Sequence, residues 1–286
     1  MDKKAENPTP EVLQSMTRVE ISNLTLFFDN PHFFKDISQE NAWKILEAYH
    51  ETYWRILKEV FGKEQNEISL PAFPEANIVL TKSKEIFREL YHSPQRFDSL
   101  PEWAHDYCNL RRNLYVVLLQ ENEDQIPIFH ISCHEFTHLM IPVVFGLPPT
   151  YILQLWPTWM REGFSVGLNQ LQPLEWLMHQ LHNPEVKVPT LEGIKKNGIF
   201  YYDKHSPEKN VAYQYCYWVT VELGKLLRQK IYGDHPKVNV PPLAALGAFS
   251  QRSYRKGITS LDEGLQLYGI DEKAAEENCR KLLQLT

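Results

Sequence analysis

The pattern of hydrophobic and polar positions along the chain predicts two long helices and a mainly helical second half. Between residues 40 and 61, apolar residues recur three and four positions apart, which is the spacing of one helical face, and Gly62 follows them. A second long helix is predicted for residues 211–232, ended by Gly233. Shorter helical patterns, interrupted by Gly269, follow it to the end of the sequence.

Short runs of branched and aromatic residues predict strands, all of them in the first half of the chain. One strand is expected over residues 19–28, one around residues 78–80 and one over residues 113–119. The pattern therefore predicts an α+β fold. We expect a single domain, with an N-terminal α/β lobe at about residues 18–141 and a helical lobe at about residues 142–286.

A long connection interrupts the helical half of the chain. Residues 183–210 are polar and contain proline and glycine at several positions. A stretch of this length between two helices is expected either to lack regular structure or to form a lid over a site.

Composition and charge narrow the classes of protein to which the chain can belong. Its 286 residues include 43% hydrophobic and 23% charged residues, as in an ordinary soluble globular protein. The net charge of −6 argues against a nucleic-acid partner, and neither a long apolar run nor a basic cluster predicts a membrane partner. The N-terminus is polar, and the four cysteines are far apart, so we expect free thiols and a cytoplasmic location. Nothing in the sequence indicates the oligomeric state.

The strongest chemical signal is the run H-E-F-T-H at residues 134–138. Two histidines four positions apart lie on one face of a helix, separated by about 6 Å along its axis. At that separation His134 and His138 can bind one tetrahedral zinc ion. Glu135 is then held near the open position of the metal, where it can take a proton from a bound water.

A second motif downstream supplies a third ligand. The helix that carries H-E-F-T-H is expected to end or kink at Pro142. After it, the run W-M-R-E-G-F-S at residues 159–165 places Glu162 on a separate helix. A catalytic zinc site uses three protein ligands and one water, so Glu162 can complete the set with His134 and His138.

Together the two motifs resemble those of the gluzincin metallopeptidases, more closely the aminopeptidase N and leukotriene-hydrolase group and more distantly thermolysin. Those enzymes pair H-E-x-x-H with W-x-x-E-G-x-[AS], and the resemblance covers roughly residues 113–233. It implies a zincin-like fold, a peptide or protein substrate, and one Zn²⁺ held by His134, His138 and Glu162. It also implies that Glu135 is the general base. The alternative is a catalytically silent zinc-binding protein that uses the same cleft to hold a peptide or protein partner.

The resemblance further implies a tyrosine that donates a hydrogen bond to the oxyanion formed during peptide hydrolysis. In the aminopeptidase-like group this tyrosine stands near the start of a helix after the third ligand. Tyr213 occupies a similar context and is the first choice. The other candidates for this role are Tyr217, Tyr202, Tyr215 and His205.

One departure from the family pattern bears on specificity. The aminopeptidases hold the free amine of their substrate with the glutamate of a G-x-M-E-N strand motif, which this sequence lacks. The strand at residues 113–119 instead offers the backbone of an edge strand to an extended peptide. Arg111 and Arg112 precede it and would repel an amine. We therefore expect an endopeptidase rather than an aminopeptidase, with the connection at residues 183–210 closing over the cleft.

Overall fold

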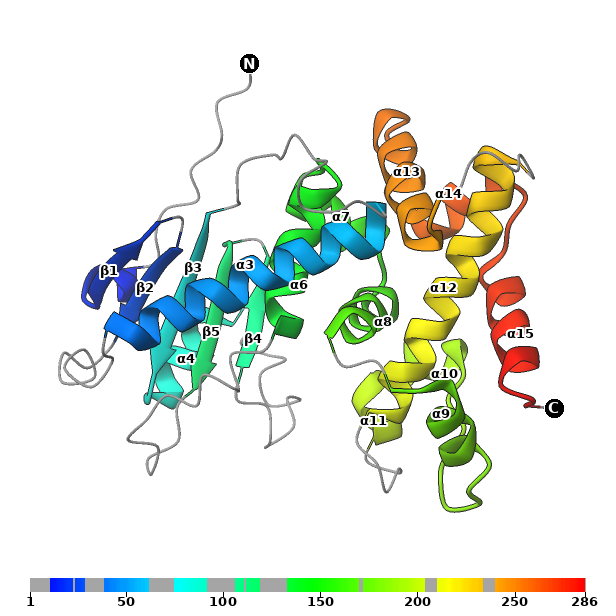
Figure 1. Ribbon diagram of the computed structural model, residues 1–286, viewed down its shortest axis with the longest axis horizontal. Helices are drawn as coiled ribbons and strands as arrows, with labels where there is room; N and C mark the ends of the chain where they lie inside the picture. The colour runs from blue at the N-terminus through cyan, green and yellow to red at the C-terminus, as the bar shows by residue number, and fades with distance from the viewer. Residues whose placement is uncertain are drawn as a thin grey trace. The chain divides into compact units, whose positions relative to one another are not determined.

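The structure, a computed structural model, shows an α+β fold and confirms the expected fold class (Figure 1). By its internal contacts the chain divides into a sheet unit, Met1–Tyr53 with Leu70–Met140, and a helical unit, Trp54–Ser69 with Ile141–Thr286. The structure describes residues 11–22, 24–28, 39–61, 75–91, 106–110, 112–118, 133–169, 172–203, 210–233 and 240–285.

The sheet unit contains a mixed sheet of five strands. In spatial order these are β1 (Thr17–Ile21), β2 (Leu24–Phe28), β3 (Ala76–Thr81), β5 (Leu114–Leu118) and β4 (Asp106–Asn109). The β1–β2 and β4–β5 pairs are antiparallel, whereas β2–β3 and β3–β5 are parallel. Within the described residues, β1 and β4 are therefore the two edges of the sheet.

Two predictions about the strands are wrong. The single strand expected over residues 19–28 is a hairpin, because the chain turns at Ser22, whose φ is +55°, and β1 folds back on β2. The strand expected over residues 113–119 is not an edge, since both β3 and β4 pair with it. Its backbone groups are already used within the sheet, so it cannot capture a substrate.

Strand β4, which the pattern of the sequence did not reveal, lies at that edge instead. Its buried side chains bond to the end of helix α4 (Lys84–Leu90): the Tyr107 hydroxyl donates to the carbonyl of Phe87 at 2.8 Å, and the Asn109 amide donates to that of Leu90 at 3.0 Å. The four residues Asp-Tyr-Cys-Asn include one aromatic and no branched residue, so they give little strand signal. The hydrogen bonds to α4 stabilise this strand, although its own residues do not predict it.

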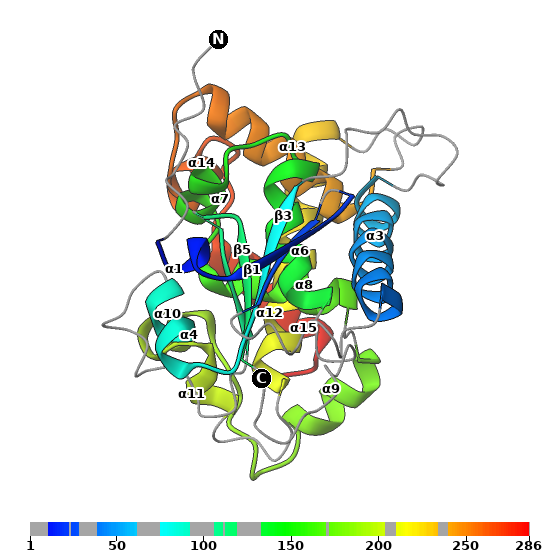
Figure 2. The same ribbon diagram turned by 90° about the vertical axis from the view of Figure 1, so that its left-hand side faces the viewer.

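The two faces of the sheet are covered by different helices (Figure 2). Helix α1 (Glu11–Gln14) and α4 cover one face, and their apolar residues share a core with the strands. That core consists of Leu13, Met16, Phe27, Val79, Phe87, Leu90, Tyr107, Leu114 and Val116.

Helices α3 (Gln39–Phe61) and α6 (Cys133–Val144) meet the other face through aromatic contacts. Phe136 of α6 packs edge-to-face on Tyr115 of β5, with ring centroids 5.2 Å apart, and on Tyr49 of α3, with centroids 4.9 Å apart. All three rings are fully buried. Because Phe136 lies inside the H-E-F-T-H run, these contacts fix the motif helix against the sheet.

Pro142 lies inside helix α6 and does not end it, so of the two expected effects the end is wrong and the kink stays a prediction. The helix continues to Val144, and the Phe145 N–H still bonds to the carbonyl of Ile141 at 3.1 Å. The helix has ended by Gly146, whose φ is +63°. Proline removes the one bond that its own nitrogen would have donated and crowds the preceding turn, but the N–H groups that follow it can still donate. Among the described residues, no single helix is long and apolar enough to cross a membrane. Residues 134–144 of α6 and the next helix, which are bent by 103° relative to each other, reach the required length and apolar composition only as a pair.

Helix α12 (Val211–Tyr232) is the centre of the helical unit and has the bounds predicted from the sequence. Helices α8 (Thr158–Asn169), α13 (Pro242–Arg255) and α15 (Glu272–Leu282) pack along it (Figure 1). The remaining helices of this unit are α7 (Pro149–Leu155), α9 (Leu174–Leu181), α10 (Leu191–Asn197), α11 (Ile199–Asp203) and α14 (Leu261–Gln266).

The described part of the connection at residues 183–210 contains two helices, α10 and α11. The Thr190 hydroxyl caps α10 by accepting a hydrogen bond from the Gly193 N–H at 3.0 Å. The carboxylate of Glu276 on α15 accepts another from the Leu191 N–H at 2.8 Å. The expectation of an unstructured connection is therefore wrong where these helices lie, at residues 191–203. The alternative, a lid over the site, stays a prediction, and residues 204–209 lie outside the described part.

Candidate metal centre

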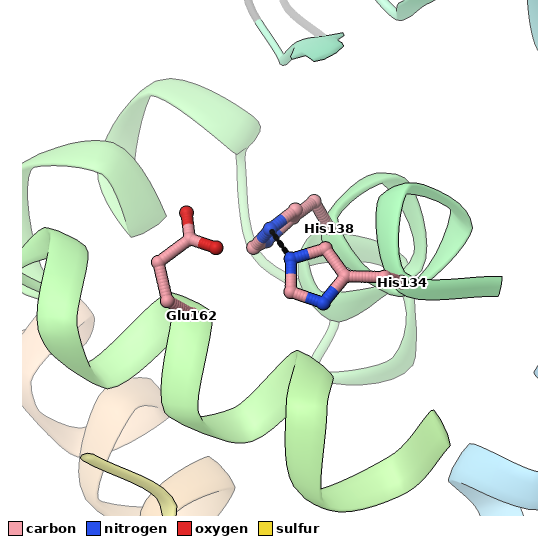
Figure 3. A group of neighbouring side chains, drawn as sticks. All are labelled: His134, His138 and Glu162. Atoms are coloured by element: carbon pink, nitrogen blue, oxygen red, sulfur yellow. Dashed lines mark hydrogen bonds between the residues drawn. The ribbon is translucent and has the colours of Figure 1, made fainter. Parts of the chain in front are cut away.

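His134 and His138 lie one turn apart on α6 and direct their Nε2 atoms to the same point (Figure 3). These nitrogens are 3.2 Å apart, and the two rings are nearly perpendicular, at 82°. Two nitrogen ligands of a tetrahedral zinc ion, each about 2.1 Å from the metal, lie roughly 3.4 Å from each other. The histidine pair therefore fits two corners of a zinc coordination sphere.

Glu162 of α8 supplies a carboxylate to the same place (Figure 3). One ligand atom from each of His134, His138 and Glu162 lies within 4.8 Å of the others. His138 is buried and the other two side chains are partly buried. Two imidazole nitrogens and one carboxylate oxygen form a donor set that suits zinc and leaves a coordination position open. The three residues expected to be ligands are thus brought together and can hold a metal ion.

The carboxylate of Glu135 lies beside this group. Its Oε1 atom is 3.9 Å from Nε2 of His134, the nitrogen that faces the candidate metal position, and its side chain is only 15% exposed. A metal ion bound to Nε2 of His134 would lie within reach of the Glu135 carboxylate through one bridging water molecule. Glu135 therefore lies beside the candidate metal position.

Two of the tyrosines considered for the oxyanion role contact other helices. The Tyr215 hydroxyl donates to Glu276 of α15 at 2.9 Å, and burial together with this carboxylate raises the pKa of Tyr215. The Tyr202 hydroxyl lies directly against Gly193 of α10, where a Cβ atom would overlap it. Each hydroxyl thus has a structural contact within the helical unit.

Tyr213 and Tyr217 stay as candidates. Tyr213 lies in the first turn of α12 with its side chain buried. The ring of Tyr217, one turn later, lies against Gly167 of α8, and burial followed by the nearby Glu59 raises its pKa. His205 falls outside the described residues. The role expected for Tyr213 remains a prediction.

No family model matches the chain, and no curated protein is significantly similar to it. The interpretation of the site therefore rests on the two motifs and on the geometry of the three candidate ligands.

Proposed function

We propose that this protein is a zinc-dependent metallopeptidase that cleaves internal peptide bonds. The observation that carries the proposal is the convergence of His134, His138 and Glu162, with Glu135 beside them. A zinc ion bound there would act as a Lewis acid, polarising the scissile carbonyl and making water more acidic. Three protein ligands with one open position are typical of catalytic rather than structural zinc sites.

The protein's own side chains would perform the proton transfers. Glu135 takes a proton from the attacking water on a carboxylate oxygen and later gives it to the nitrogen of the leaving amine. Because its side chain is 15% exposed, bulk water has little access to it. Tyr213 donates a hydrogen bond to the oxyanion, in keeping with the family resemblance.

Strand β4 is the element that would bind the substrate backbone. Within the described residues it pairs with β5 on one side only and is an edge strand, the kind of element to which an extended peptide can add. The carboxylate on this strand, Asp106, already accepts a hydrogen bond from the Tyr115 hydroxyl at 2.9 Å. This arrangement favours capture of a chain segment through its backbone over capture of a free amine.

The proposal is tested by metal analysis and peptide hydrolysis on the same preparation. We expect about one zinc per chain by mass spectrometry, and cleavage of a diverse pool of unfolded peptides that stops when zinc is chelated and resumes when it is restored. A protein that holds zinc and cuts nothing in the pool would instead be the silent binding protein. A protein without affinity for zinc would contradict both functions.

N-terminal acetylation of the substrate should leave the cleavage rate within about twofold of that for the free peptide. A buried ammonium group costs several kcal/mol to desolvate unless a carboxylate meets it, and an endopeptidase has no need to bind one. Matched peptides with free and acetylated termini are compared by kcat/KM, with the cleavage position read by mass spectrometry. Loss of cleavage on acetylation would identify an aminopeptidase, and Asp106→Asn would then test whether the β4 carboxylate binds the amine.

Tyr213→Phe is expected to lower kcat by about 10²-fold with little change in KM, the effect of losing one donor to an oxyanion. Steady-state kinetics on a cleaved peptide provide the measurement. Tyr215→Phe is the matched control, because it removes a hydroxyl from the same helix whose hydrogen bond goes to Glu276. An unchanged kcat in Tyr213→Phe would transfer the role to Tyr217 or His205.

A further inference from the structure

Gly163, the residue after Glu162, lies directly against the backbone of α12. A Cβ atom on Gly163 would be 2.5 Å from the carbonyl carbon of Cys216 and 2.7 Å from its oxygen. It would also be 2.7 Å from the backbone nitrogen of Tyr217. Ordinary contact begins at 3.4 Å, so only glycine allows the two helices to approach this closely.

Other contacts hold α8 along the same stretch of α12. Gly167, one turn after Gly163, has the ring of Tyr217 over it. Just beyond the helix, the Gln172 N–H donates to the side-chain oxygen of Gln214 at 3.1 Å. The face of α8 that Gly163 and Gly167 define is therefore fixed on α12 over one turn, and a further bond follows just beyond the end of α8.

We infer that Gly163 is a positioning residue for the candidate metal ligand Glu162, an inference that rests on the proposed metal-binding function. Adding a methyl group at Gly163 requires α8 to move about 0.9 Å from α12 to reach ordinary contact. The obstacle is helix backbone, which cannot rotate aside as a side chain can. Glu162 precedes Gly163 in the same helix and moves with it, whereas metal–ligand distances vary by only about 0.2 Å in a well-formed site.

Gly224 offers a matched control, because it lies on α12, the helix against which Gly163 of α8 packs. A Cβ atom there would be 2.5 Å from the backbone oxygen of Pro242 and 2.8 Å from its carbonyl carbon, at the contact of α12 with α13. The collision is of the same kind and severity as at Gly163. No candidate ligand neighbours Gly224, so its substitution measures the cost of separating two helices without displacing Glu162.

The test compares Gly163→Ala with Gly224→Ala. Three quantities are measured: the zinc Kd by competition with a chelator, the visible absorption spectrum of the Co²⁺-substituted protein, and urea unfolding of the zinc-free protein. We expect both variants to lose stability. Only Gly163→Ala should weaken zinc binding, by about 10- to 100-fold as for other residues that orient ligands, and alter the Co²⁺ spectrum.

The outcomes separate this inference from the proposed function. A zinc Kd in Gly163→Ala equal to that of the parent, or weakened equally in Gly224→Ala, would overturn the positioning role while leaving the metal site in place. A parent protein that binds no zinc would overturn the proposed function itself.

A second pair of variants serves if Gly163→Ala does not fold. Gly167→Ala presses α8 against the Tyr217 ring, and adding Tyr217→Ala removes that ring. We expect Gly167→Ala to weaken zinc binding and the double variant to restore it. Zinc binding that is unchanged in Gly167→Ala would show that the spacing of α8 and α12 does not control the site.

Discussion

Glu135→Gln is expected to bind zinc as tightly as the parent protein and to lose about 10²- to 10⁴-fold in kcat, the contribution of a positioned general base. Glutamine preserves the size of the side chain and its place 3.9 Å from Nε2 of His134, but it cannot accept a proton at neutral pH. Zinc content and peptide hydrolysis are measured on one preparation of each protein.

The control for this substitution is Glu175→Gln, which changes an exposed carboxylate on α9 in the same way. It should leave both zinc content and kcat unchanged. Parent-like hydrolysis by Glu135→Gln would show that another group takes the proton, even with the metal site intact.

His138→Ala and Glu162→Ala should each reduce zinc occupancy from about one ion per chain to a small fraction of that. Losing one ligand of three leaves two donors and an open, poorly shaped site, so we expect affinity to fall by more than the roughly 10- to 100-fold typical of residues that merely orient ligands. Zinc is quantified by mass spectrometry after dialysis against a weak chelator. Hydrolysis should fall in proportion to the zinc lost.

His182→Ala is the matched control for the ligand substitutions. His182 is an exposed histidine that caps α9, where its Nδ1 lies 2.7 Å from the carbonyl oxygen of Met178. It should keep full zinc occupancy. If Glu162→Ala also kept full occupancy, the third ligand would lie elsewhere, and the interpretation of α8 as part of the metal site would be wrong.

The helices could be predicted from the sequence because their signals are local. The bounds of α12 follow from apolar spacing and from Gly233, whose φ of +69° ends the helix. Strand pairing instead depends on residues far apart in the sequence. The pairing of β4 with β5, and the bonds from Tyr107 and Asn109 to α4, have no local signature.

The same distinction applies to the candidate site. His134 and His138 could be predicted as a pair because a helix alone sets their separation. Glu162 could be named only through its own motif and the family resemblance, since nothing local links it to α6. The contact of Gly163 with Cys216 could not be foreseen, because it depends on where two helices cross.

The two strands at the edges of the described sheet differ in their charge, and this bears on self-association. Edge β1 carries Arg18 and Glu20, which are both exposed and form an ion pair. Charged side chains on an edge strand oppose pairing with other chains. Edge β4 carries Asp106 as its one charged residue, and the carboxylate is bonded to Tyr115. At high concentration, self-association of this protein should therefore proceed through β4, and an extended peptide bound along that strand should suppress it.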